Sequence, residues 1–387
     1  MNIGIDISSL IYDRGVSRYT ANLVKALAEH KDLNLFLYGA SLRQESKLKK
    51  AVKEINNDSK ATIKSNIQKL PPSLLTRFWD FGFNPIGNIF PKLDLFHSWD
   101  WIQPPDKKLP LVSTIHDLAI LKYPETAHPK ILKRHQKSWK ILKQRKAHII
   151  AVSQATKKDI VEELAIPSSR VHVIYEALPQ ETAKVANELS EDKYNKIKDK
   201  LKLDRPYLLF VGTREPRKNL KKLIKAWGSF SKTHDLIIAG EEGWDETSNT
   251  KSSNNPSKQN NDEIKPRFLG KVTDQELVVL YSEAECFVYP SLYEGFGLPI
   301  LEAFSFGTPV VTSNISSMPE VAGNAAELVN PNSIEDIKNG IEKILHEPQK
   351  KQQERLQKMI IRLQLFSWKR VAKETREVYE RIYRENQ

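Results

Sequence analysis

The chain has 387 residues, of which 40% are hydrophobic and 28% charged, and its formal net charge at pH 7 is +12. This length allows two domains that each bury a core, and the single cysteine, Cys286, excludes a disulfide-stabilised scaffold. No run of about 18 apolar residues occurs, so we expect a cytoplasmic protein with no membrane-spanning helix.

The first half of the chain alternates short apolar runs with segments of helical spacing. The apolar runs are bounded by polar or proline-rich turns, which is the pattern of buried parallel strands. The predicted strands are 3–7, 33–38, 93–97, 111–116 and 148–152, and a helix is predicted over 19–27. The segment 41–72 lacks this pattern, and it fits either a loop at the ligand site or a helical hairpin that covers the sheet.

Two positions in this half are candidates for ligand binding. Gly15 follows the first predicted strand and precedes the first helix, where a glycine lets the backbone approach a ligand. His116 closes the strand 111–116, and residues at the carboxyl ends of strands in doubly wound domains face the ligand crevice. A structural role, hydrogen-bonded to a neighbouring loop, is the alternative for His116. His97 also ends a strand but lies in no comparable motif, so we expect it to be structural.

Eight basic residues and no acidic one lie between Lys130 and Lys146. Apolar residues recur among them at nearly helical spacing, which predicts an amphipathic helix. Three interpretations are open: a solvated basic face, a surface attracted to anionic lipid head groups, and a nucleic-acid site. The sequence has no helix-turn-helix, zinc-ligand or RNA-recognition pattern, so we expect no nucleic-acid partner.

The alternation of strand and helix patterns restarts after a charged stretch with few apolar residues at 178–203, which predicts a domain boundary. The predicted strands of the second half are 207–212, 236–239, 267–269, 286–289 and 310–312. Residues 247–263 form a polar, low-complexity segment that we expect to be a disordered surface loop. The last segment, 366–383, is strongly amphipathic and predicts a helix with one buried face.

The strand 207–212 runs into the sequence GTREPRKNL, which precedes a helical segment. Gly212 lets the backbone approach a ligand, and Arg217 and Lys218 supply positive charge for a diphosphate. A basic pair is most often ordinary surface. Here it lies in a strand-to-helix loop of a doubly wound domain, where ligands bind, so the functional interpretation is favoured.

The most informative stretch is YEGFGLPILEA, in which seven residues separate Glu294 from Glu302. Gly297, Leu298 and Pro299 mark the start of a helix after a strand. A helix N-terminus presents free N–H groups and a positive dipole to a phosphate. Two acids that flank a diphosphate can bind hydroxyl groups on either side of it, so the segment indicates a sugar-nucleotide site. A solvated loop acid and a surface acid of an amphipathic helix are the alternative.

These motifs, in this order, resemble the retaining family-four glycosyltransferases with the GT-B fold, and the resemblance covers nearly the whole chain. It implies an α/β protein of two doubly wound, Rossmann-like domains that face a central cleft. Residues 1–178 would form the acceptor-side domain and 203–366 the nucleotide-sugar donor domain. Residues 367–387 would form a C-terminal helix that crosses back to the first domain.

The resemblance also implies roles for residues at matching positions. His116 and Glu294 are the implied catalytic residues, which hold the donor sugar, while Glu302 binds the ribose hydroxyls. The implied donor-binding residues are Gly15, Gly212, Thr213, Arg217, Lys218, Gly297, Leu298 and Glu302. Thr213 departs from the arginine that many members carry after the glycine, but a subgroup written GTxxPRKNL shares the threonine.

The implied reaction transfers a hexose from a nucleoside diphosphate sugar to a glycan or lipid-linked glycan in cell-envelope polysaccharide synthesis. The subgroup motif and the sequence His116-Asp117-Leu118 resemble mannosyltransferases, so GDP-mannose is the expected donor. Retention without an enzymic nucleophile implies front-face attack, in which the leaving phosphate accepts the acceptor's proton.

No D-x-D sequence occurs, so we expect a metal-independent enzyme without a cofactor. Residues 130–146 are a candidate contact to an anionic membrane, which would make the protein peripheral on the inner face of the membrane. The alternatives are a non-hydrolysing nucleotide-sugar epimerase and a non-catalytic basic protein that binds membrane surfaces.

Overall fold

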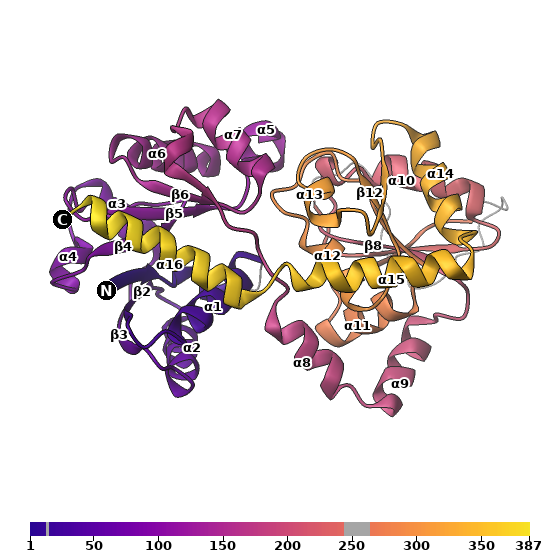
Figure 1. Ribbon diagram of the computed structural model, residues 1–387, viewed down its shortest axis with the longest axis horizontal. Coiled ribbons are helices and arrows are strands. Elements are labelled where there is room, and N and C mark those ends of the chain that lie inside the picture. Colours follow the sequence, from indigo (N-terminus) through magenta and orange to yellow (C-terminus); the bar gives the residue numbers. More distant parts are fainter. Residues whose placement is uncertain (13–14, 244–263) are drawn as a thin grey trace. The chain divides into compact units, whose positions relative to one another are not determined.

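The computed structural model describes residues 1–12, 15–243 and 264–387, so the loop predicted at 247–263 lies outside the described residues. The chain forms two compact units (Figure 1). One consists of residues 1–179 and 366–387, and the other of residues 180–365. Each contains a parallel sheet connected by helices, as the alternating patterns predict.

The described residues of the first unit form a seven-stranded parallel sheet in the order β3-β2-β1-β4-β5-β6-β7. The strands are β1 (Asn2–Asp6), β2 (Asn34–Ala40), β3 (Thr62–Gln68), β4 (Leu95–Trp99), β5 (Leu111–Ile115), β6 (His148–Ala151) and β7 (Val171–Val173). The chain adds β2 and β3 on one side of β1 and the later strands on the other. The strand order therefore reverses between β1 and β4, and such a reversal opens a ligand crevice at the carboxyl ends of the two strands.

The helices of the first unit are α1 (Gly15–Ala28), α2 (Glu45–Asn57), α3 (Pro72–Asp80), α4 (Ile86–Ile89), α5 (Ala119–Lys122), α6 (Pro129–Gln144), α7 (Gln154–Leu164) and α16 (Trp368–Glu385). The segment 41–72 forms neither the loop nor the helical hairpin that we expected. It contains α2 and the edge strand β3, which pairs with β2 along its whole length. Only Ile63 and Ile67 are apolar in β3, because an edge strand of this sheet stays half-exposed, and so the apolar-run pattern missed it.

The C-terminal helix α16 belongs to the first unit, as the resemblance implied, and packs against α1 and β4. His97 of β4 joins this contact: its Nδ1 lies 2.6 Å from the Tyr379 hydroxyl, and its Nε2 lies 2.8 Å from Thr114 Oγ1. Burial lowers the pKa of His97 to about 3, so the ring is neutral. His97 is therefore a structural residue, as predicted.

The described residues of the second unit form a six-stranded parallel sheet in the order β10-β9-β8-β11-β12-β13, which reverses between β8 and β11. The strands are β8 (Tyr207–Val211), β9 (Asp235–Ala239), β10 (Arg267–Gly270), β11 (Cys286–Tyr289), β12 (Val310–Ser313) and β13 (Glu327–Val329). The helices are α8 (Gln180–Glu188), α9 (Glu191–Leu201), α10 (Leu220–Trp227), α11 (Asp274–Glu283), α12 (Leu298–Ser305), α13 (Met318–Ala322), α14 (Ile334–Leu345) and α15 (Gln349–Gln364).

The charged stretch 178–203, which predicted the domain boundary, consists largely of the helices α8 and α9. Both pack against α11 and belong to the second unit. The stretch has few apolar residues because surface helices of this kind bury only a narrow stripe, here Ile197 and Leu201 of α9. Across the described ranges, no helix is both long enough and apolar enough to cross a membrane.

Candidate active site

The reversal of strand order in the second unit places the loop after β8 beside the loop after β11. Asn219 joins the two loops, since its side chain donates to the carbonyl of Pro290 at 3.0 Å, and it also donates to the carbonyl of Pro331, in the loop after β13, at 2.7 Å. The N–H of Leu292 donates to the carbonyl of Arg217 at 2.7 Å. These bonds fix the backbone from which the predicted diphosphate-binding side chains project.

Three of the predicted site residues form one buried ionic cluster. Arg217 Nη1 lies 2.7 Å from one carboxylate oxygen of Glu294, and Lys218 Nζ lies 2.7 Å from the other. Lys218 also donates to the Tyr289 hydroxyl at 2.6 Å, and Arg217 Nε pairs with Glu215 at 2.6 Å. Glu294 and Lys218 are each only 7% exposed. The structure therefore brings together residues that are 76 positions apart, at the place where the topology predicts a ligand.

The charge of Glu294 is set by its two cations. Burial alone raises its pKa, but the charges of Arg217 and Lys218 outweigh burial and lower the pKa to about 2. The backbone of the same residue is also fixed, since Ser316 and Ser317 donate to its carbonyl at 2.8 and 3.0 Å. Glu294 is thus a rigid, permanently ionised acceptor whose charge is balanced by two donors.

The helix α12 begins at the predicted turn. Gly297 precedes it with a φ of 101°, a left-handed conformation that favours glycine, and Leu298 is its first residue. Pro299 occupies the second helical position. Glu302 lies on α12, is nearly buried, and accepts a hydrogen bond from the Tyr281 hydroxyl at 3.0 Å. Pro299 has no N–H, and the N–H of Ile300 donates to the carbonyl of Gly297 at 3.0 Å, so the N–H of Leu298 is the candidate donor to a ligand in the first turn of α12.

The glycine loop after β8 has the geometry that the motif predicts. Gly212 has a φ of 150°, which favours glycine. Thr213 is exposed, whereas Arg214 is buried, pairs with Glu242 at 2.9 Å and lies 5.0 Å over the ring of Phe268. Arg214 thus packs inside the second unit, and Thr213 is the residue of this turn that a ligand can reach.

In the first unit, His116 follows β5 and bonds to an acid that the sequence patterns did not single out. Its Nδ1–H donates to Glu176 at 2.7 Å. Its Nε2 is buried and has no hydrogen-bond partner among the described residues. The rings of Tyr19 and Trp99 lie against the imidazole, with centroid separations of 4.7 and 6.2 Å. The arrangement fixes the ring and leaves one nitrogen for a ligand.

Glu176 also controls the charge of His116. Burial alone lowers the pKa of the imidazole, but the hydrogen bond and the charge of Glu176 outweigh burial and raise the pKa above its usual value. Glu176 comes just after β7, so a sequence signal existed: it is an acid at the carboxyl end of a strand, like His116 itself. We missed it because β7 has only three residues.

Gly15 is the first residue of α1 and is exposed. A Cβ atom placed on it would meet no described atom within 4 Å, so packing within the first unit does not require a glycine there. Gly15 and His116 lie in the first unit, whereas all the other predicted site residues lie in the second.

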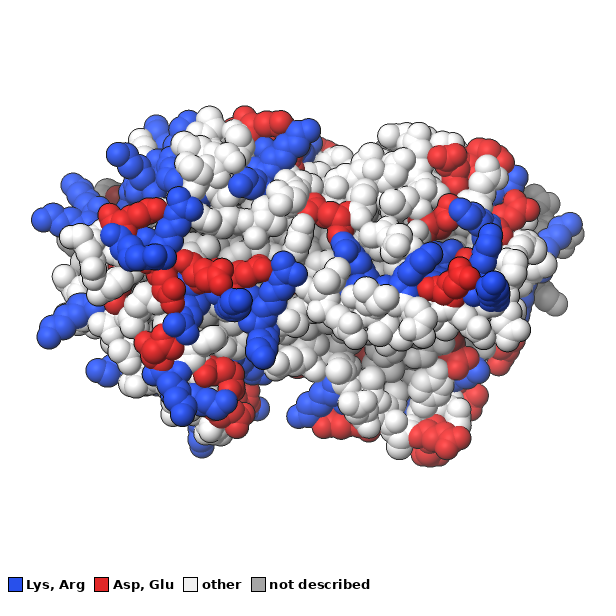
Figure 2. All heavy atoms as spheres, viewed as in Figure 1, with Lys and Arg blue, Asp and Glu red and all other residues white. Residues whose placement is uncertain are grey.

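The basic segment forms α6, and its charges divide into two groups. Arg145, just after the helix, donates to the carbonyls of Pro104 and Leu109, Arg134 contacts Thr76, and Lys137 pairs with Asp80 at 2.7 Å. The other five are exposed lysines: Lys130, Lys133, Lys140, Lys143 and Lys146. Figure 2 shows lysine and arginine side chains gathered over the part of the first unit where Figure 1 draws α6.

Comparisons with known proteins decide the family. Residues 14–180 match the family described as Glycosyltransferase Family 4, and residues 192–361 match Glycosyl transferases group 1. The O-antigen chain mannosyltransferase B of Escherichia coli is 31% identical over 345 residues, which cover 84% of each chain. The chain is a family 4 glycosyltransferase. The enzyme catalyses glycosyl transfer, and the epimerase and the non-catalytic alternatives are set aside.

Two further similarities agree with this assignment. The glycosyltransferase is also similar to the O-antigen chain mannosyltransferase RfbU of Salmonella typhimurium. The two are 30% identical over 231 residues, and these residues cover 60% of each chain. A glycosyltransferase structure from Rickettsia africae superposes with a TM-score of 0.67 over 98% of both chains, at 16% identity. That likeness confirms the predicted GT-B fold. In the part of the enzyme that the structure describes, no group of three or more His, Cys, Asp or Glu side chains is placed to hold a metal ion.

Proposed function

We propose that the glycosyltransferase moves a mannosyl residue, with retention, from GDP-mannose to a glycan or lipid-linked glycan of a cell-envelope polysaccharide. The observation that carries the proposal is the cluster of Glu294, Arg217 and Lys218 at the strand-order reversal of the second sheet. The Escherichia coli and Salmonella typhimurium relatives are both O-antigen chain mannosyltransferases, which supports mannose and a polysaccharide acceptor.

In this proposal the diphosphate takes over the cations that Glu294 now holds. Arg217 can bind two phosphate oxygens and Lys218 a third, while the N–H of Leu298 at the start of α12 adds a donor. These groups stabilise the charge that develops on the leaving diphosphate. Glu294 then accepts from the sugar hydroxyls and Glu302 from the ribose hydroxyls. In the first unit the proposed sugar ligand is the Nε2 of His116, which is buried and has no hydrogen-bond partner among the described residues.

The same residues support catalysis without a metal ion or cofactor. Two cationic side chains and a helix N-terminus can neutralise a diphosphate that other enzymes neutralise with a divalent cation. No protein nucleophile is assigned, so we propose front-face attack, in which the acceptor hydroxyl gives its proton to the leaving phosphate.

The decisive experiment is calorimetric titration of the enzyme with GDP, UDP and ADP, each with and without EDTA. We expect GDP alone to bind tightly, EDTA to leave the affinity unchanged, and Lys218→Ala to abolish binding. The matched control is Lys225→Ala, which removes an exposed lysine of α10. Preferential binding of UDP would replace GDP-mannose as the donor, and loss of binding in EDTA would overturn metal independence. The anomeric configuration of the product, read by NMR, tests retention.

We further propose that the first unit contacts an anionic membrane through α6 and the turn that follows α3. Phe81 and Phe83 in this turn are 77% and 64% exposed, although phenylalanine is normally buried. The turn is ordered: the N–H of Phe83 donates to the carbonyl of Phe78 at 2.8 Å, and Gly82 has a φ of 81°. The ion pair of Lys137 with Asp80 holds α6 next to this turn. Exposed lysines beside exposed aromatic rings suit an anionic lipid surface.

Vesicle pelleting tests this contact. The enzyme should sediment with vesicles that contain phosphatidylglycerol and not with pure phosphatidylcholine. The double variant Phe81→Ser/Phe83→Ser and the variant Lys133→Glu/Lys140→Glu should each lose most of the binding. Ile361→Ser, at an exposed apolar position of α15, is the control. Unchanged sedimentation of both variants would rule this surface out.

A further inference from the structure

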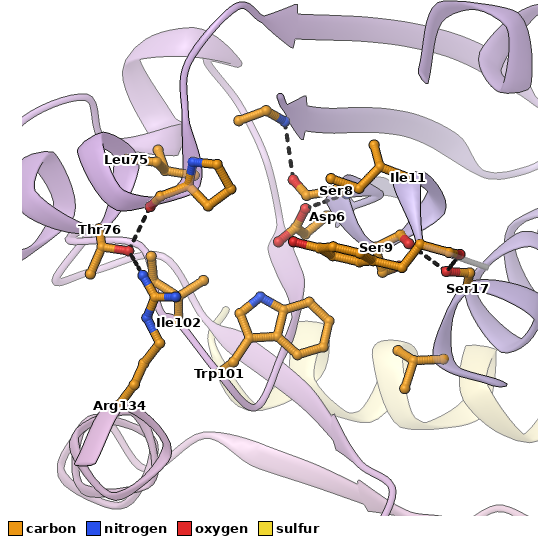
Figure 3. Close-up of a pocket in the computed structure, with 14 residues that line it drawn as sticks. Asp6, Ser8, Ser9, Ile11, Ser17, Leu75, Thr76, Trp101, Ile102 and Arg134 are labelled. Atoms are coloured by element: carbon orange, nitrogen blue, oxygen red, sulfur yellow. Dashed lines mark hydrogen bonds between the residues drawn. The ribbon is translucent and has the colours of Figure 1, made fainter. Parts of the chain in front are cut away.

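The last helix of the chain, α16, packs against the surroundings of His116. The imidazole lies against the rings of Tyr19 and Trp99 and bonds to the carboxylate of Glu176. Tyr19 belongs to α1 and Trp99 to β4, and α16 contacts both of these elements. Figure 3 shows α16, in pale yellow, next to α1. Side chains of α16 therefore reach the groups that hold His116 in place.

Trp368, the first residue of α16, supports two of these groups. Its ring lies edge-on to the ring of Tyr19, at a centroid separation of 5.5 Å and an interplanar angle of 64°. Its indole N–H donates to the carbonyl of Leu178 at 2.8 Å. Leu178 comes shortly after Glu176 in the chain, so this bond fixes the backbone next to the acid that bonds to His116.

Tyr379, further along α16, supports the third group through His97. The Tyr379 hydroxyl lies 2.6 Å from Nδ1 of His97. The ring of His97 lies 5.3 Å from the indole of Trp99, and Trp99 stacks on His116 at 6.2 Å. Tyr379, His97 and Trp99 are all fully buried. A shift of Tyr379 would therefore be passed on to the imidazole of His116 through two packed rings.

Trp99 also borders the space that is open to ligands in the first unit. It stacks on Trp101 at a centroid separation of 6.2 Å, and its indole N–H donates to the carbonyl of Asp6 at 2.7 Å. Trp101 and Asp6 line a cavity of about 400 Å³, together with Arg134 (Figure 3). The residues that α16 supports thus lie directly behind a wall of this cavity.

Apolar packing alone explains neither of the polar contacts that α16 makes here. An apolar side chain can fill the space of Trp368 or Tyr379, whereas a buried N–H or hydroxyl requires a partner in a defined direction. Buried hydrogen bonds of this kind specify one arrangement of a core. The helix is therefore fixed in position and rotation at the two places that bear on His116.

We propose that Trp368 and Tyr379 are positioning residues for His116, which hold its imidazole where Nε2 meets the donor sugar. They act through the three groups around the imidazole. A small displacement of a group that binds the reacting sugar lowers the rate strongly, because stabilisation of the transition state depends on distance and direction. This inference rests on the proposed function for the role of His116.

A double-mutant cycle tests whether the two residues act through His116. The variants are Trp368→Phe, which keeps a ring but loses the indole N–H, and Tyr379→Phe, which loses only the hydroxyl. Each should lower kcat about 10-fold in the wild-type background and less than about twofold in the His116→Asn background. Ile382→Ala, which removes a buried apolar side chain of α16, is the control. It should lower the Tm and leave kcat within about twofold of wild type.

NMR titration of the His116 imidazole, without nucleotide, separates this proposal from the proposed function. Burial lowers the pKa of His116, and the bond and charge of Glu176 raise it. A less firmly held Glu176 should therefore let His116 titrate at lower pH in Trp368→Phe, but not in Ile382→Ala. GDP affinity should be unchanged in every variant, because these residues lie in the first unit.

Two results would overturn the positioning role, provided that thermal unfolding shows folded variants. One is an equal loss of kcat in the wild-type and His116→Asn backgrounds. The other is a His116 titration in Trp368→Phe that matches wild type. Failure of GDP to bind wild type, with the titration shifted as expected, would overturn only the donor assignment.

Discussion

The two sheets of this glycosyltransferase reverse their strand order in the same way, but the residues at the two reversals differ in how they use their charges. At the second sheet, Arg217 and Lys218 both pair with Glu294, and Arg217 also pairs with Glu215, so their charges are compensated within one cluster. At the first sheet, the Nε2 of His116 has no partner among the described residues, and Asp6 faces a cavity. In the second sheet these charged side chains are all paired with one another. In the first sheet the Nε2 of His116 still lacks a hydrogen-bond partner among the described residues.

This difference teaches how one fold can serve two kinds of ligand. A diphosphate is negatively charged, so its site needs cationic donors. Before the ligand binds, the positive charge of these donors must be compensated by another group. A buried carboxylate provides that neutralisation, since unpaired buried cations are costly. A neutral sugar brings no charge, so its site needs single, well-placed donors and acceptors beside an apolar surface. Single substitutions at each site show whether the two sites are separable in this sense.

The largest effect is expected for Lys218→Ala. In the proposed function the variant loses a donor to the leaving diphosphate, so the rate of transfer should fall about 100- to 1,000-fold. Steady-state kinetics with GDP-mannose measure this rate, and Lys225→Ala is the control variant that also loses one lysine. If the rate fell less than about threefold, the cluster would not be where charge develops in the reaction.

A smaller loss is expected for His116→Asn. Transfer should slow about 100-fold, because the variant loses a positioned nitrogen, while the affinity for GDP alone should stay within twofold of wild type. The two results are expected together, because a nucleotide that is bound only by the second unit does not contact His116. The substitution should therefore lower the transfer rate without changing the affinity for GDP. A parallel fall in GDP affinity would show that the two sites are not separable.

Glu294→Gln should change nucleotide binding in the opposite direction. The neutral amide no longer competes for Arg217 and Lys218, so GDP should bind about 5- to 10-fold more tightly. The transfer rate should fall, since the amide accepts the sugar hydroxyls less well than a carboxylate. Calorimetry and turnover on the same preparation measure both effects. Weaker GDP binding in a folded variant would contradict the view that Glu294 holds the cations in place of the diphosphate.

The smallest effect concerns Glu176→Gln and is read from pH. Glu176 raises the pKa of His116, so the His116 imidazole should titrate at lower pH in the variant than in wild type. NMR of the imidazole measures this directly. A raised pKa stabilises the folded state below the usual histidine pKa, and this contribution is lost as pH rises through the raised value. The Tm of the variant should therefore fall more at pH 6 than at pH 8.5. An equal loss at both pH values would assign Glu176 a packing role only.

The sequence by itself determined the class of fold, the family and most residues of the proposed donor site. Buried parallel strands appear as short apolar runs. The turn at Gly212 and the helix start at Gly297 depend on local backbone conformation, which neighbouring residues specify. Local patterns also identified His116 as a functional candidate. They failed at β3, β7 and β13, because a half-exposed edge strand and strands of three residues carry too few apolar residues to form a pattern.

Only the tertiary structure decided the partners of these residues. The pairs Lys218–Glu294 and His116–Glu176 join positions 76 and 60 apart, and no spacing within the chain predicts such a contact. The structure also divided the basic stretch, by turning Arg134 toward a cavity that Asp6 and Trp101 line. Hydrogen bonds and ion pairs depend on distances of a few ångströms between distant segments. Packing sets those distances, so they become known only once the chain has folded.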